Sequence, residues 1–332
     1  MLLLLSAVVS LSLGSAQLPL AHVWGILWHQ LPVVGDWVHA NWPQSSEKIV
    51  LEVRLPRVLL AILIGACLSL SGAGFQGVLR NPLADPYTLG VASGAAVGAA
   101  FIILFGLQSV LFGAWTTPVV AFCTGLFSLL IVLRLANIHG KFQLETLILS
   151  GVVVQAFLGS MVSFMVSLSE KVVNEIVFWL MGSLAMRGWS FAYMLVPFLL
   201  CGLAVLLAYA RTLNLLVLGE RQAGHLGVRV TRTRLVVLIV CTFMTAAAVS
   251  VAGTIGFVGL VVPHLVRLMA GPDHRLLIPL SAIFGGVYLL WADTLARMAL
   301  SPAEIPLGVV TAFLGAPFFA YLLRKNKKMT RA

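Results

Sequence analysis

The stretch LNLLVLGERQAGHLGVRVTRTR, residues 213–234, carries four arginines, one glutamate and one histidine. The chain on both sides of it consists mostly of Leu, Val, Ala, Phe and Gly. A helix needs about 20 apolar residues to cross a bilayer, so charges this dense must end one membrane-spanning helix before the next begins. The stretch therefore predicts a loop between two spans, and it limits where the neighbouring helices end and begin.

The composition indicates that the whole chain is a membrane protein. It has 332 residues, of which 60% are hydrophobic and 10% are charged, whereas soluble domains average about 25% charged residues. We predict an all-α polytopic membrane protein with a single transmembrane domain over residues 1–332. The net charge of +10 could indicate nucleic-acid binding, but Lys and Arg retained on the cytoplasmic side explain it more simply. We therefore expect membrane lipid as a partner, and no nucleic acid.

Apolar segments predict about ten membrane-spanning helices. They cover residues 1–18, 57–78, 88–107, 114–134, 146–168, 190–210, 235–252, 256–270, 277–297 and 306–323. With ten spans both termini lie on one side, and most of the 21 Lys and Arg residues share that side. The positive-inside rule makes it the cytoplasmic side.

The N-terminal sequence MLLLLSAVVSLSLGSAQ has two interpretations. The small residues before Gln17 fit a signal peptide, but no basic residue precedes the apolar run. We adopt the other interpretation, a first membrane-spanning helix.

Small residues recur at helical spacing in the second span. Gly65, Ser69, Gly72, Ala73 and Gly77 fall largely on one face, and small side chains let helix backbones approach closely in lipid. We therefore expect a compact bundle. We also expect the second and third spans to supply a weakly polar lining for a transport pathway.

The sequence lacks the motifs of an enzyme or a self-powered pump. GxxxxGK[ST], HExxH and GxSxG do not occur, which excludes a P-loop ATP site and two common hydrolase sites. The seven histidines form no pair at helical spacing within a span, and the four cysteines form no CxxC pair, so we expect no metal site. We predict a non-enzymatic transport protein that takes its energy from a partner.

Few ionisable residues lie inside the predicted spans. Asp293 and Arg297 are four residues apart near the outer end of the ninth span, which fits either an ion pair on the helix or a charged rim facing an outer vestibule. Glu145 opens the fifth span, where a helix N-terminus stabilises a negative charge. A proton-coupled transporter usually needs acidic residues deeper in the membrane.

The polar stretch itself predicts a short amphipathic helix. Leu218, Ala223, Leu226 and Val230 form a small apolar stripe at helical spacing, and Gly227 is placed to cap the helix. An apolar stripe outside the bilayer needs another protein surface to cover it.

Five further motifs follow one another along the chain. They are RLPR (54–57), QGVLRNPLADPYTLGVASGAA (76–96), WLMGSL (179–184), GTIGFVGLVVPHLVRLMAGPDHR (253–275) and AEIPLGVVTAFLGAPFF (303–319). With these motifs and LGERQAGHLGV, the chain resembles the permeases of the FecCD-type, or type II, ABC importers over nearly its whole length. Those permeases import iron-siderophores, haem and cobalamin.

The resemblance implies the partners and their sites. Such permeases form a homodimer above two separate ATP-binding subunits, which bind ATP and Mg²⁺, so we expect no cofactor on this chain. The residues that match the ATPase-coupling segment are Leu218, Gly219, Glu220, Arg221, Ala223, Leu226 and Gly227. A periplasmic or lipid-anchored substrate-binding protein docks outside, at positions that match Arg54, Arg57 and Arg297. Leu144 and Glu145 lie where the family has a cytoplasmic gate.

The substrate stays open at the level of the sequence. The resemblance implies alternating access in the cytoplasmic (inner) membrane, driven by the ATPases, with a ferric siderophore as the commonest substrate. Cobalamin and haem are the alternatives. A stand-alone secondary transporter is the competing hypothesis, and under it the polar stretch should be dispensable for transport.

Overall fold

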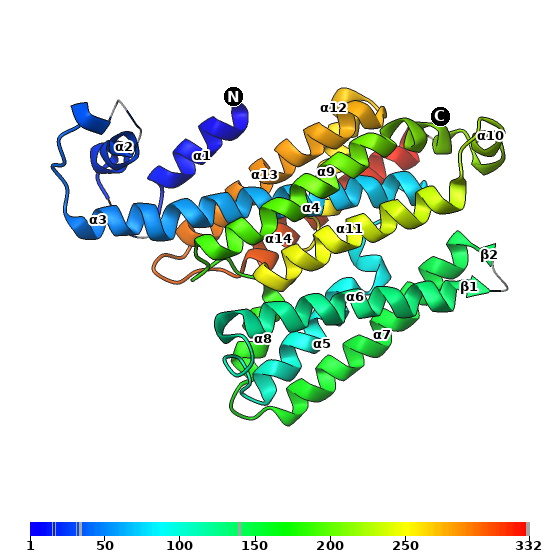
Figure 1. Cartoon of the computed structure of the whole chain (residues 1–332), viewed down its shortest axis with the longest axis horizontal. Coiled ribbons are helices and arrows are strands. Elements are labelled where there is room, and N and C mark those ends of the chain that lie inside the picture. Colours follow the sequence, from blue (N-terminus) through cyan, green and yellow to red (C-terminus); the bar gives the residue numbers. More distant parts are fainter. Residues whose placement is uncertain (15, 17, 31, 33–34, 139–140, 330–332) are drawn as a thin grey trace.

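The helices of this protein run roughly side by side, with the polar loops gathered at two opposite ends (Figure 1). The computed structural model describes residues 1–14, 16, 18–30, 32, 35–138 and 141–329. The short helix α10 (Glu220–His225) and a hairpin of two-residue strands, β1 (Asn137–Ile138) and β2 (Lys141–Phe142), lie at one end. Helices α2 (Leu20–His29) and α8 (Val173–Met181) lie at the other. We call these the inner and the outer end.

All ten predicted spans coincide with helices. In the part of the chain that the structure describes, six helical segments are long and apolar enough to cross a membrane: Gln44–Leu79 (α3, η2 and α4), Gly113–Ala136 (η4 and α6), Leu144–Leu168 (α7), Trp189–Val217 (α9), Val230–Ala252 (α11) and His274–Met298 (α13). Four further apolar helical segments of the described residues are shorter: α1 (Leu2–Ser12), α5 (Val91–Leu104), α12 (Val258–Ala270) and Leu307–Tyr321, the apolar part of α14 (Leu307–Met329). The all-helical fold is therefore confirmed, and the two-residue strands only close the loop between α6 and α7.

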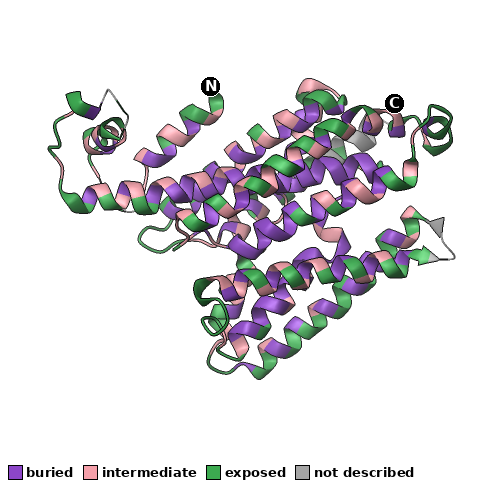
Figure 2. Ribbon diagram, viewed as in Figure 1, coloured by how far each residue is buried: buried purple, intermediate pink, exposed green. Residues whose placement is uncertain are grey.

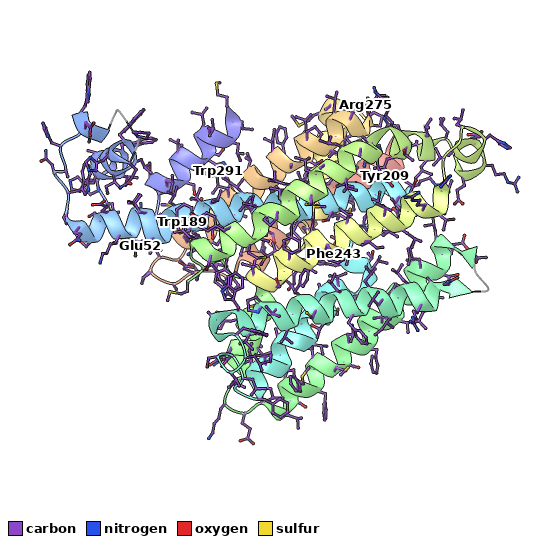
Figure 3. All side chains as sticks on the ribbon, in the orientation of Figure 1. Glu52, Trp189, Tyr209, Phe243, Arg275 and Trp291 are labelled. Atoms are coloured by element: carbon purple, nitrogen blue, oxygen red, sulfur yellow. The ribbon has the colours of Figure 1, made fainter. Side chains whose placement is uncertain are left out.

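The second span begins earlier than its apolar run indicates. Helix α3 (Gln44–Lys48) continues through a π-helical turn, η2 (Ile49–Arg54), into α4 (Leu55–Leu79). Pro56 has no N–H to donate and its ring crowds the preceding turn, and the wider π turn just before it accommodates both effects. The helix therefore extends beyond the bundle at the outer end, where Trp189 Nε1 at the start of α9 donates a hydrogen bond of 2.9 Å to the carbonyl of Leu51 (Figure 3).

Helix α4 is the centre of the bundle, and 89% of its most apolar window is buried (Figure 2). It packs against α9, α11, α12 and α13. A Cβ at Gly72 would overlap the carbonyl of Gly259 on α12, and one at Gly65 would overlap that of Gly285 on α13. The small residues therefore allow backbone-to-backbone contact, which confirms the packing predicted from their spacing.

The helices around α4 expose much of their apolar surface. Only 28% of the corresponding window is buried in α7 and in α9. In a soluble protein such surface would be hidden, whereas a membrane-spanning helix presents it to lipid or to a neighbouring subunit. The exposed stripe of α7 includes Val153, Phe157 and Phe164.

Candidate functional site

The inner end carries the predicted short helix, which is α10. Gly219 begins it with a φ of 110°, a conformation that only glycine adopts without strain. Gly227 ends it with a φ of 84°, and the amides of Gly227 and Val228 donate to the carbonyls of Gly224 and Ala223 at 3.0 Å. This pair of bonds is a Schellman motif, so the capping role predicted for Gly227 is confirmed.

Ion pairs hold α10 against the bundle through Glu220. Its carboxylate accepts a hydrogen bond of 2.5 Å from Arg234 on α11, and it lies 3.4 Å from Nη2 of Arg80, just after α4. The hydrogen bond from Arg234, together with the charges of Arg234 and Arg80, lowers the pKa of the Glu220 carboxyl below its ordinary value. Glu220 thus joins α10 to two membrane-spanning helices.

The predicted apolar stripe is divided in the structure. Ala223 is fully buried against the bundle, whereas Leu218 and Leu226 are exposed at 56% and 59%. The prediction of one continuous face was wrong because α10 has only six residues, so Leu218 precedes it and Leu226 caps it. The division leaves two exposed leucines beside a helix fixed to the core, with Arg221 also exposed.

The outer end contains a buried cluster of charges that joins three helices and a loop. The Arg57 guanidinium on α4 donates to Asp293 on α13, with Nη2 2.9 Å from Oδ1. The same guanidinium forms two further bonds of 2.9 Å with Glu304, in the loop before α14. Arg297 Nε donates to Asp293 Oδ2 at 3.0 Å, and its Nη1 donates to the carbonyl of Leu13 beyond α1.

The three arginines proposed for docking are all engaged inside the protein. Arg54 donates to the carbonyls of Leu11 and Ala16. The exposed fractions of Arg54, Arg57 and Arg297 are 5%, 9% and 5%, and Asp293 is fully buried. Of the two interpretations of Asp293 and Arg297, the ion pair is present, and it is buried rather than on the helix surface. Sequence reasoning missed the role of Glu304, whose only signal was its place in the AEIPLGVV motif.

A weakly polar hollow of about 370 Å³ lies between α5, α7 and the turn after α11. Its polar lining residues are Tyr87, Ser93, Gln155 and Thr254, and the remainder are Ala92, Ala96, Gly159, Val162, Leu180 and Gly256. The third span, one of the two that we expect to offer weakly polar faces, lines this hollow with Ala92, Ser93 and Ala96. The second span does not line it, because α4 is enclosed on nearly all sides, and α7 supplies Gln155, Gly159 and Val162 instead. Which spans line a transport pathway stays a prediction.

The two residues predicted as a gate begin α7. Leu144 is partly buried against the core and Glu145 is exposed in the first turn of the helix. This placement at a helix N-terminus fits the electrostatic explanation for Glu145. The gating role stays a prediction.

Taken together, the ten apolar helices, the hollow between them and the helix fixed at the inner end define a multi-pass membrane permease. The chain belongs to the FecCD transport family, whose profile matches residues 2–325. It is therefore an ABC importer permease of the type II fold.

Individual relatives agree with this assignment. The chain is 43% identical, over 99% of its length and 93% of the other, to the uncharacterised ABC transporter permease YvrB of Bacillus subtilis. It is 48% identical to the cobalamin import permease BtuC of Halobacterium salinarum, over 86% of this chain and 76% of that one. Other relatives are named for molybdate, hemin and Fe(3+) dicitrate.

A solved structure, an inward-facing putative metal-chelate type ABC transporter, superimposes with a TM-score of 0.83 at 34% identity. The superposition covers 98% of this chain and 96% of the other.

Proposed function

We propose that this chain is the membrane-spanning subunit of an importer that moves an iron chelate, most simply a ferric siderophore, across the cytoplasmic membrane. Two copies form the pathway, and two separate subunits supply ATP hydrolysis and bind ATP and Mg²⁺. The observation that best supports this proposal is the arrangement of α10: Glu220 anchors the helix to the bundle, while Leu218 and Leu226 stay exposed.

The anchoring of α10 supports a coupling role. A helix that transmits force must be fixed to the moving spans on one side and must contact its partner on the other. The Glu220 ion pairs and buried Ala223 fix it to α11 and α4, and two exposed leucines offer an apolar contact to an ATPase. The excess of Lys and Arg near this end supports a cytoplasmic orientation for it and for both termini.

The hollow between α5 and α7 supports a shared pathway. It is open on one side, and α7 beside it exposes an apolar stripe. A second copy of the chain facing this side would close the hollow into a pathway lined mainly by Ala, Gly and a few neutral polar groups. Such a lining passes a polar chelate without binding it tightly.

A binding protein can dock through Arg54, Arg57 and Arg297 only if one of these arginines exchanges an internal hydrogen-bond acceptor for a group of the binding protein. Asp293 is inaccessible, but the Glu304 side chain is 34% exposed and shares the Arg57 guanidinium. A carboxylate of the binding protein could replace Glu304 there, because both would present the same geometry to the arginine. The variant Glu304→Gln should then bind the binding protein more tightly, whereas unchanged affinity would assign the arginines a purely structural role.

The substrate class rests on the relatives. Those named for hemin and Fe(3+) dicitrate support an iron chelate, and the one named for cobalamin supports the main alternative. Uptake into vesicles that contain the permease, the ATPase and the cognate binding protein should be compared for ferric siderophore, haem and cobalamin. Preference for cobalamin or haem would overturn the siderophore proposal and leave the permease role intact.

The coupling role has a direct test. Leu226→Asp should abolish co-purification with the ATPase subunit, because a charge in an apolar contact is costly to desolvate. Leu300→Asp is the matched control, since Leu300 is similarly exposed (63%) but follows α13 at the outer end. Uptake that persists in the Leu226 variant, and that needs neither the ATPase subunit nor ATP, would favour the stand-alone transporter instead.

A further inference from the structure

A second cavity, of about 590 Å³, lies at the inner end and takes no part in the proposed pathway. It is lined by the ends of four membrane-spanning helices and the loops that follow them. Its lining residues are Gln76, Gly77, Leu79, Arg80, Asn81, Pro82, Val217, Arg267, Pro272 and His274. Two of these are arginines, and none is acidic.

Arg267, on α12, is the central cation of this cavity. Its Nη2 donates to the side-chain Oε1 of Gln76 at 3.1 Å. Among the ion pairs of the described residues, none involves Arg267. A partly buried guanidinium that is satisfied by one neutral amide retains donors for an anion.

His274 provides a second, independent observation. The residue is only 3% exposed, and its Nδ1 lies 2.8 Å from the side-chain oxygen of Asn214. Its Nε2 is buried and has no hydrogen-bond partner in the described part of the chain. A Cβ at Gly77 would lie 2.7 Å from this nitrogen, so only glycine lets α4 pack this closely against the imidazole. Asn214 donates its amide to Asp273, so its oxygen accepts from Nδ1–H of His274, and in the neutral imidazole this leaves Nε2 as an acceptor for a hydroxyl or a water.

Arg80 brings the third polar group to the cavity. It ends α4 with a φ of 49°, a left-handed conformation that costs about 1 kcal/mol for a residue other than glycine. This conformation directs the side chain across the end of the bundle, where its pairing with Glu220 is long at 3.4 Å and half-exposed. The other nearby acid, Asp273, is already engaged by Asn214 and by the amide of Arg275.

We propose that this cavity binds a phosphate group, held by Arg267 and Arg80, with His274 Nε2 as an acceptor for a hydroxyl of the ligand or a water. Guanidinium groups match the geometry of phosphate oxygens, and basic pockets between membrane-spanning helices on the cytoplasmic side bind phospholipid headgroups. An anionic lipid of the inner leaflet and free phosphate share this chemistry. The proposed phosphate site follows from the geometry of these residues alone. Only the choice of an inner-leaflet lipid as the source of the phosphate rests on the proposed cytoplasmic orientation of this end.

The test uses the full-length chain in detergent and measures lipid retention by native mass spectrometry. The probes are phosphatidylglycerol, phosphatidylcholine and inorganic phosphate. Arg267→Gln should weaken retention of phosphatidylglycerol by about tenfold or more, because it removes a charge-assisted contact. Arg275→Gln is the matched control: this arginine is exposed at the same end but does not line the cavity, and it should retain lipid as the wild type does (Figure 3).

A second variant distinguishes loss of the binding site from misfolding of the Arg267→Gln protein. Gln76→Glu has the same shape and places a carboxylate beside Arg267, so it should also abolish binding while it stabilises the arginine. Both variants should elute as monodisperse protein in gel filtration.

The outcomes separate the two sources of phosphate. Selective retention of phosphatidylglycerol, lost with Arg267 but not with Arg275, identifies a lipid site. Saturable thermal stabilisation by inorganic phosphate, lost in the same variant and without lipid retention, identifies a free-phosphate site. The proposal would be overturned by equal effects of both arginine variants, by equal retention of phosphatidylcholine, or by no binding of either probe. In that case an ordered water is the simplest partner for His274 Nε2.

Discussion

Replacement of Asp293 by Asn should destabilise the protein more than any other conservative change at the outer end. Asp293 is fully buried and accepts bonds from Arg57 (2.9–3.2 Å) and Arg297 (3.0 Å). The amide keeps the volume of the side chain but removes its charge, so two buried guanidinium groups lose their common counter-ion. Loss of one partner of a buried ion pair costs about 3–5 kcal/mol.

Glu304→Gln is the matched control for this experiment. Glu304 binds the same guanidinium, but its side chain is 34% exposed and water can replace it in part. Its loss should cost about 1 kcal/mol, as for pairs near a surface. The two variants therefore differ in burial while they share Arg57.

Thiol labelling during heating provides the assay. Cys67 and Cys241 are buried and become reactive only on unfolding, and replacement of the exposed Cys123 and Cys201 by Ala removes the background. The midpoint for Asp293→Asn should fall well below that for Glu304→Gln. Equal midpoints would refute the inference that the buried carboxylate stabilises the junction of α1, α4 and α13.

Three further changes test other parts of the structure. Glu220→Gln should cost under about 1 kcal/mol of stability because the side chain is half-exposed, yet it should uncouple ATP hydrolysis from uptake in reconstituted vesicles; coupled transport at the wild-type rate would contradict the anchoring role. Gly72→Ala should lower the free energy of unfolding by about 1–3 kcal/mol, and with it the unfolding midpoint, because the added methyl group overpacks against Gly259; Gly159→Ala, with open space around it, should not destabilise the protein. Burial raises the pKa of Asp85 from 3.8 to about 6, so the native state binds this proton more tightly than the unfolded chain; stability should fall as the pH rises from about 4 to 6, and Asp85→Asn should remove that dependence from pH-resolved melting curves.

The positions of the spans were predictable because they depend on local properties. Apolar length and the distribution of Lys and Arg reflect the cost of placing charge in a bilayer, and each can be counted along the chain. For the same reason α10 and its Gly227 cap were predictable from a few adjacent residues. The extension of the second span to Gln44 was not, because a π-helical turn before Pro56 has no clear sequence signature.

The candidate site was predictable only in part. The resemblance assigned Glu220 to coupling, but its partners Arg80 and Arg234 come from the ends of two other helices. The second and third spans were both predicted to line the pathway, because both are rich in small residues. Whether such residues meet another helix or an open hollow depends on what packs against them.

The sequence alone predicted about ten apolar spans with a polar segment between the sixth and the seventh, and the resemblance of its motifs predicted an importer permease. Hydrophobic length and charge are properties of consecutive residues. The tertiary structure decided which charges are buried and which surfaces stay open. Arg57 and Asp293 are 236 residues apart in the chain, and they form a buried pair only because α4 and α13 pack at glycine contacts. Likewise, Ala223 is covered and Leu226 is exposed because α10 is fixed to α11 in one orientation, which no periodicity within six residues specifies.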